Sequence, residues 1–253
     1  MLLGWIGAIF IGLSLGLLGS GGSILTVPVL IYLFGQEEKL AIAGSLAIVG
    51  TIALAGAAAY IKLGLIAWKT VVIFAIPSMV ATYIGAFLAT YLSGITQLII
   101  FACIMFLAAI FMLRNAKYEQ TQQNFSALKI FSSGSVVGIM TGLIGVGGGF
   151  LILPSLVLFA GLGMRQAVAS SLVIIASNAY MGFVKYFMIL QQGDIRLDWT
   201  IIISVSLIGI IGTIIGNYLC HKIPQQRLKK YFAYFLLLMA IFIISKEVSR
   251  SLS

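Results

Sequence analysis

Apolar segments separated by short polar turns make up nearly the whole chain. In the first half, residues 1 to 18 are apolar, the stretch GSGG at 19 to 22 interrupts them, and residues 23 to 34 are apolar again. A helix of about twelve residues rises only about 18 Å, which is too short to cross a bilayer core about 30 Å thick. Three longer segments follow, each long enough for a transmembrane helix: 40–61, 70–91 and 95–113.

The second half of the chain repeats the first. Many glycines, prolines and aromatic residues recur at an offset of 126, which becomes 131 after an insertion near residue 191. Examples are Gly19/Gly145, Gly21/Gly147, Gly22/Gly148, Pro28/Pro154, Ser45/Ser171, Tyr60/Tyr186, Trp68/Trp199, Thr82/Thr213 and Gly85/Gly216. Such a repeat predicts two homologous membrane units, residues 1–113 and 127–253, joined by a polar linker at 114–126.

Each half contains a glycine-rich run within its apolar sequence. The first is GLLGSGGSILTVP, from Gly16 to Pro28, and the second is GLIGVGGGFLILP, from Gly142 to Pro154. Glycine costs roughly 1 kcal/mol per helical position relative to alanine, so both runs predict a broken helix, with Pro28 and Pro154 contributing to the break. Unpaired main-chain groups survive at bilayer depth only inside protein or beside a water-filled cavity. The two runs are therefore expected to line a polar cavity.

Composition places the chain in a membrane. Of its 253 residues 61% are hydrophobic and 8% are charged, whereas a soluble domain has about 25% charged residues. The Lys and Arg residues behind the net charge of +9 lie mostly between the spans, as the positive-inside rule predicts, so they do not indicate a nucleic-acid partner. The expected fold is an all-α integral membrane protein in which each half has a glycine-broken helical hairpin and three transmembrane helices.

The Lys and Arg distribution also bears on the orientation of the two halves. If each glycine-rich segment crosses the membrane once, nine basic residues lie on one side and six on the other. If each enters and leaves on the same side, or crosses twice, the counts are ten and five. The second arrangement fits the positive-inside rule slightly better. It makes the halves inverted repeats and places both termini outside.

Charge placement within the spans favours an anion as the ligand. All six acidic residues lie in predicted loops or at helix ends: Glu37, Glu38, Glu119, Asp194, Asp198 and Glu247. A cation or proton pathway usually retains an acidic residue within the bundle, whereas hydroxyl groups, amides and helix N-termini bind oxyanions. The candidate substrate-binding residues are Gly19, Ser20, Gly21, Gly22, Ser23, Ser45, Gly145, Gly147, Gly148, Gly149, Ser170, Ser171 and Asn178. No metal site and no cofactor are expected.

Several residues have a structural role as the alternative. Gly56, Gly85, Gly182 and Gly216 are expected to allow close helix packing, and serines in membrane helices can donate to the backbone of their own helix. Lys185 either extends to the membrane surface or supplies a counter-charge to the substrate.

Catalytic chemistry has no candidates in the sequence. The motifs HExxH and GxSxG, a carboxylate pair and a Cys/His cluster are absent, so an enzyme is not expected. A membrane scaffold or assembly factor needs no motif and stays an alternative, as does an anion channel. A scaffold, however, has no use for broken helices at bilayer depth.

The doubled motif resembles that of a known family. GLLGSGGSILTVPVL and GLIGVGGGFLILPSL, each followed by an AxxSL-like segment (AGSLAI from Ala43 and ASSLVI from Ala169), are similar to the TauE/SafE family of sulfite exporters, also called the toluenesulfonate uptake permease family. The resemblance covers essentially the whole chain. The family motif falls on the two glycine-proline runs and on Ser45, Ser170 and Ser171, with Gly44 where the second copy has Ser170.

The resemblance implies a multi-pass carrier in a bacterial inner membrane. Its expected substrates are small sulfur-containing anions such as sulfite, thiosulfate, sulfoacetate or other organosulfonates, moved by alternating access as one half rocks against the other. A negative cell interior favours anion efflux by about 2.3 kcal/mol per charge per 100 mV. Uptake would therefore need a coupling cation, either Na⁺ or H⁺. The direction of transport stays open.

Overall fold

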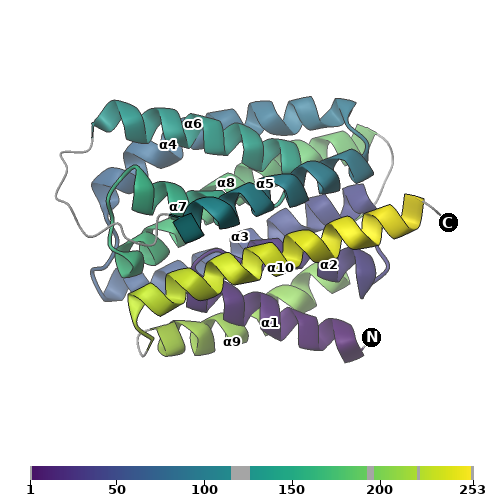
Figure 1. Cartoon of the computed structure of the whole chain (residues 1–253). Coiled ribbons are helices and arrows are strands. Elements are labelled where there is room, and N and C mark those ends of the chain that lie inside the picture. The colour runs from purple at the N-terminus through teal and green to yellow at the C-terminus, as the bar shows by residue number, and fades with distance from the viewer. Residues whose placement is uncertain (1, 115–125, 193–196, 221–222, 252–253) are drawn as a thin grey trace.

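The computed structural model of the chain describes residues 2–114, 126–192, 197–220 and 223–251. Most of the linker at 114–126 and the acidic residues Glu119 and Asp194 lie outside these ranges. All regular structure in the described residues is helical (Figure 1). The α-helices are α1 (Leu2–Leu18), α2 (Gly21–Tyr32), α3 (Glu38–Lys62), α4 (Trp68–Leu88), α5 (Gly94–Arg114), α6 (Ala127–Ile144), α7 (Gly149–Leu158), α8 (Met164–Gln192), α9 (Trp199–Cys220) and α10 (Gln225–Ser251), and the short 3-10 helix η1 (Ala89–Tyr91) follows α4.

Five of these helices are long and apolar enough to cross a membrane: α3, α4 with η1, α6, α8 and α9. The segments predicted at 40–61, 70–91 and 95–113 correspond to α3, to α4 with η1 and to α5, and each end differs by at most two residues. The expectation of an all-α multi-pass membrane protein is therefore confirmed for the part of the chain that the structure describes.

The first glycine-rich segment forms a hairpin of two antiparallel helices. The rings of Trp5 in α1 and Phe34 just after α2 lie 5.4 Å apart. A Cβ at Gly7 would lie 3.1 Å from Val29, and one at Gly22 would meet the Ile11 carbonyl. Both ends of residues 5–34 therefore lie together, and the chain reverses direction at the break.

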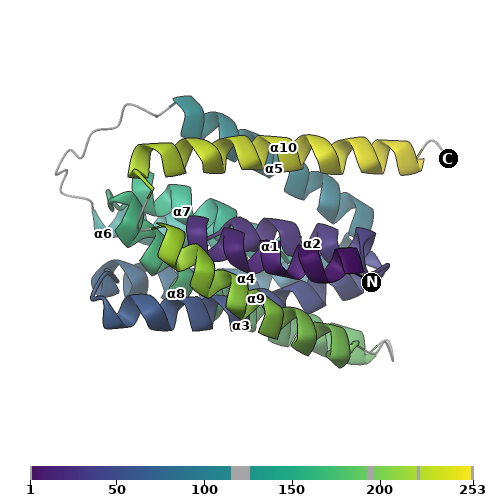
Figure 2. The same ribbon diagram turned by 90° about the horizontal axis from the view of Figure 1, so that it is seen from below.

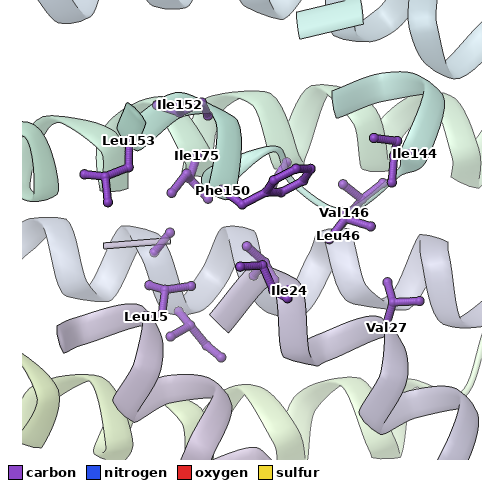
Figure 3. Packing of buried hydrophobic residues seen from close by; sticks show 14 of the residues in the cluster. Leu15, Ile24, Val27, Leu46, Ile144, Val146, Phe150, Ile152, Leu153 and Ile175 are labelled. Atoms are coloured by element: carbon purple, nitrogen blue, oxygen red, sulfur yellow. The ribbon is translucent and has the colours of Figure 1, made fainter. Parts of the chain in front are cut away.

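The second segment reverses in the same way. Gly148, just before α7, lies directly against Thr141 in the last turn of α6. In Figure 3, Ile144 at the end of α6 lies on one side of Phe150, whereas Leu153 lies on the other. The hairpin α1–α2 begins at the end of the bundle where the N-terminus is marked, and α6–α7 begins at the opposite end (Figure 1).

Two pairs of helices from different halves of the chain approach unusually closely. Helix α1 packs along α9, and α4 packs along α6. A Cβ at Gly12 of α1 would overlap the carbonyl of Gly209 in α9, and one at Gly142 of α6 would overlap the carbonyl of Thr82 in α4. Small residues allow membrane helices to approach in this way. The packing roles predicted for Gly85 and Gly216 are confirmed, since a Cβ at either position would clash with the carbonyl oxygen of Ile139 or of Leu13, respectively.

Helices α3 and α8 pack against each other and connect the two close pairs. Helix α3 also contacts α9, and α8 also contacts α4. Helices α5 and α10 lie side by side and form a separate layer on one side of the bundle (Figure 2). The tip of the first hairpin lies against α8 and that of the second against α3 and α8. Residues 19–22 and 145–148 are buried, so the glycine breaks lie inside the protein.

Candidate functional site

The first break is short and the second is longer. Between α1 and α2 only Gly19 and Ser20 are outside a helix, and Gly19 has φ +70°. Between α6 and α7 four residues, 145–148, are outside a helix, and three of them have φ values of +64° to +72°. Glycine is the residue that adopts such left-handed conformations without steric cost. The glycine runs thus break the helices as predicted, although Gly21 and Gly22 lie in the first turn of α2 and Gly149 is the first residue of α7.

The two breaks bring the N-termini of α2 and α7 together. A Cβ at Gly149 would lie 2.8 Å from the Ser23 hydroxyl oxygen and 3.0 Å from the Ser20 Cβ. Figure 3 shows Ile24 of α2 facing Phe150 of α7, with Val27 and Leu153 on opposite sides of this pair. The two short helices therefore start at one point and run apart. Their positive dipole ends meet there.

Main-chain donors are available at this junction. In the described residues, the N–H groups of Ser20, Val146, Gly147 and Gly148 form no main-chain hydrogen bond. The first N–H groups of any helix also lack an intrahelical acceptor. The side chains of Ser20 and Ser23 are completely buried. The junction of the two breaks is therefore a buried, donor-rich region, which suits an anion.

Ser45 and Ser171 hold the breaks rather than point into open space. Ser45 in α3 donates to the Gly145 carbonyl at 3.2 Å, and Ser171 in α8 donates to the Gly19 carbonyl at 3.1 Å. Each hydroxyl also lies within hydrogen-bond distance of a carbonyl in its own helix. Each serine thus contacts the left-handed glycine of the other half of the chain. These serines shape the backbone of the site.

The remaining predicted residues lie at some distance along the same helices. The Ser170 hydroxyl accepts a hydrogen bond from the Ala67 N–H at 3.0 Å, just before α4 begins. Asn178 lies two turns further along α8, where its Nδ2 donates to the Ser78 hydroxyl of α4 at 2.6 Å. The structure does not bring Ser170 or Asn178 into the junction formed by Ser20, Ser23 and Gly149.

Pro28 and Pro154 do not end helices. Pro28 lies inside α2 and Pro154 inside α7, and both helices continue past them. The expectation that they mark helix breaks is therefore corrected, because the chain breaks at the glycines. A proline inside a helix still removes one donor.

Three further buried polar residues were not selected from the sequence. Gln97 in α5 donates to the Leu143 carbonyl, just before the second break, and to the Tyr186 hydroxyl, both at 3.0 Å. Ser78 and Thr82 in α4 are completely buried and face α8. The repeat pair Thr82/Thr213 was the only sequence feature that could have indicated one of them.

Lys185 lies on α8 and reaches toward aromatic rings of α4. Its Nζ lies 5.1 Å from the ring centre of Tyr83 and 4.9 Å from that of Phe87. Both rings are partly exposed on the outer surface of the bundle, so this ammonium faces outward. Its position agrees with the surface role rather than with a counter-charge at the junction. No group of three potential metal ligands among His, Cys, Asp and Glu occurs in the described residues.

Comparison with known proteins identifies the family. The sequence model described as "Sulfite exporter TauE/SafE" matches residues 5–243. A "Probable membrane transporter protein" of Xylella fastidiosa (strain 9a5c) is 30% identical over 242 residues, covering 92% of this chain and 91% of the relative. Proteins with the same description from Haemophilus influenzae and Methanocaldococcus jannaschii are 28% and 27% identical, covering 91% and 86% of this chain and 92% and 85% of the relatives.

No solved structure matches the chain. The family match nonetheless extends over both glycine breaks and all five long apolar helices. The chain therefore belongs to the TauE/SafE sulfite exporter family.

Proposed function

We propose that the protein is a secondary transporter that carries small sulfur-containing anions, such as sulfite, thiosulfate or an organosulfonate. Its family and the names of its relatives support a membrane transporter. The observation that carries the proposal is the meeting of the N-termini of α2 and α7 at Gly149 and Ser23. Two positive helix ends and their free N–H groups stabilise an oxyanion without a fixed positive charge that would trap it.

The packing supports two inverted repeats. In the repeat, α1 corresponds to α6, α3 to α8 and α4 to α9. The contact between α1 and α9 is therefore equivalent to that between α6 and α4, and the contact between α3 and α9 to that between α8 and α4. All four contacts are present. The two serine bonds from Ser45 and Ser171 correspond in the same way. The hairpins begin at opposite ends of the bundle (Figure 1). Inverted repeats with broken helices near the midplane are a common transporter design.

Alternating access would require a movement that keeps the close pairs intact. Since α1 is packed backbone to backbone on α9 and α4 on α6, the two halves of the sequence would not separate as rigid bodies. The movement would instead take place between the α1–α9 pair and the α4–α6 pair, across α3 and α8. The buried Ser20 and Ser23 correspond to a closed arrangement of the site.

Transport by purified protein in proteoliposomes tests the proposal. Labelled sulfite, thiosulfate, sulfate and sulfoacetate would be compared for uptake, with and without unlabelled anion inside. We expect at least one sulfur anion to enter, and internal substrate to accelerate its entry, as it does for a carrier and not for a channel. No flux of any of the four anions would contradict the proposal.

The variant Gly147→Leu adds a test of the site. Gly147 has φ +67° and its Cβ would lie 3.1 Å from Val49, so leucine there would distort the second break and abolish flux. Gly64→Leu is the matched control, because Gly64 also has a positive φ but has open space around it. Equal flux through both variants would remove the second break from the mechanism.

A further inference from the structure

Three polar side chains meet in the interface between α4 and α8, away from the junction of the breaks. Ser78, Thr82 and Asn178 are each completely buried. Asn178 and Gly182 lie one turn apart on α8, and they face Ser78 and Thr82, which lie one turn apart on α4. Asn178 Nδ2 lies 2.6 Å from Ser78 Oγ. A Cβ at Gly182 would lie 3.4 Å from the Thr82 methyl group. The three side chains therefore occupy one stretch of the interface.

Two oxygen atoms of this group lack a partner. Asn178 Oδ1 and Thr82 Oγ1 are buried and have no hydrogen bond in the described part of the chain. Threonines elsewhere in the helices do bond to a carbonyl; Thr26 and Thr141, for example, donate to the carbonyl four residues earlier at 2.7 Å. Leaving a buried acceptor unpaired is unfavourable, so a ligand that binds oxygen atoms would compensate for it.

The group occurs in only one half of the molecule. In the repeat alignment Asn178 corresponds to Ile52 and Ser78 to Gly209, and the Ile52 side chain occupies the space where a Gly209 Cβ would lie. Thr82 corresponds to Thr213, which donates to the Gly12 carbonyl at 2.9 Å. In the corresponding interface between α3 and α9, the equivalent residues are therefore either apolar or have a hydrogen-bond partner. Packing of these helices does not require a polar group.

We propose that Asn178 Oδ1, Ser78 Oγ and Thr82 Oγ1 bind a sodium ion. Hard cations take oxygen ligands, and divalent cations generally require carboxylates. No carboxylate is available on these faces of α4 and α8. Asn178 Oδ1 can only accept, so it would repel an oxyanion. Water or main-chain carbonyls would complete the coordination sphere.

The position of this site couples it to the second break. Ala179, the residue after Asn178, has its Cβ 3.8 Å from the position of a Gly147 Cβ. A cation there attracts an anion at the break, and charges within about 8 Å at an effective dielectric constant near 20 change each other's affinity by roughly 10- to 100-fold. This coupling rests on the proposed function, whereas sodium binding itself does not.

One fixed positive charge lies further along α8, on the outer side of this interface. Lys185 lies seven residues after Asn178, about 10 Å along the axis of α8, with its ammonium turned to Tyr83 and Phe87. It opposes cation binding at that distance. We therefore expect Lys185→Gln to tighten sodium binding several-fold.

Binding of ²²Na⁺ to purified protein, measured without any sulfur anion, tests the proposal. Thr82→Val and Asn178→Leu should each lower sodium affinity at least 10-fold, whereas Thr213→Val, the matched control at the equivalent position, should not. Unlabelled Na⁺ should compete, and K⁺ and choline at the same ionic strength should compete at least 10-fold more weakly. Monodisperse elution in detergent checks that each variant is folded.

Three results would overturn the proposal: no saturable sodium binding by the wild-type protein, equal binding by Thr82→Val and wild type, or equal competition by K⁺. Loss of sulfite binding without loss of sodium binding in the Asn178 variant would assign these residues to the anion path instead. If sodium binds as expected but no sulfur anion is transported, the sodium site stands and the proposed substrate is wrong.

Discussion

At the scale of single residues, two serines connect the halves of the chain. Ser45 and Ser171 occupy equivalent positions, and each donates to the carbonyl of the first left-handed glycine in the opposite break. A sequence shows that a serine lies in a helix, but it does not show which carbonyl it will reach. The partners here are 100 and 152 residues away.

Replacing either serine should loosen the break that it contacts. Ser45→Ala or Ser171→Ala would leave a buried glycine carbonyl without this donor and should lower stability by about 1–3 kcal/mol. Thermal unfolding in detergent, followed by circular dichroism, measures the change. Ser132→Ala is the control, because that serine is exposed and bonds within its own helix. Equal stability of all three variants would show that the two contacts contribute nothing.

The left-handed glycines differ in how much space surrounds them. Alanine at Gly64 would meet only the strain of a left-handed conformation, about 1–2 kcal/mol, since no atom lies within 4 Å of its Cβ position. Alanine at Gly145 would meet the same strain and also overlap Ile42. We expect Gly145→Ala to lower the unfolding temperature clearly more than Gly64→Ala. A similar decrease for both would mean that the second break adapts freely.

At the scale of helices, the hydrophobic pattern of the sequence predicted where the helices lie but not which helices pack together. The ends of α3, of α4 with η1 and of α5 agree with the apolar segments to within two residues, because bilayer thickness fixes the length of such helices. The break positions followed from glycine content. The sequence could not show that Pro28 and Pro154 lie inside helices, since neighbouring helices in a membrane compensate for a lost hydrogen bond.

Glycines at the close helix pairs should tolerate no side chain. Gly142→Ala would place a methyl group on the Thr82 carbonyl, and overpacking of this kind costs about 1–3 kcal/mol or more. Gly44→Ala is the control, because its nearest neighbours would lie 3.7 Å away. Size-exclusion chromatography after a heat step should show aggregation of the Gly142 variant at a lower temperature. The reverse order would contradict the close approach of α4 and α6.

At the scale of the whole molecule, the two hairpins determine the topology. Single cysteines at Glu37, Ser93, Leu63 and Gln166, in a background without Cys103 and Cys220, can be labelled from outside intact cells. We expect Glu37 and Ser93 to lie on one side and Leu63 and Gln166 on the other. If each glycine-rich segment instead crossed the membrane once, Gln166 would be labelled together with Glu37.

The pairing of helices across the halves predicts that neither half is stable alone. Residues 1–114 contain α1 and α4 but lack their partners α9 and α6. Co-expressed halves, split within 115–125, should therefore copurify through a tag on one of them, whereas each half alone should be degraded. Stable accumulation of the first half alone would show that the contacts across the halves are dispensable. The repeat indicated two units, but their exchange of partners was visible only in three dimensions.

The contact between α1 and α9 also sets an order of events during synthesis. Helix α1 ends at Leu18 and α9 begins at Trp199, so at 5–20 residues per second the ribosome needs about 10–40 s to supply the partner. Throughout that time the face of α1 that packs on α9 contacts only lipid or the insertion machinery. Helix α1 is thus synthesised first, but it is among the last helices to reach its final packing position, because that position requires α9.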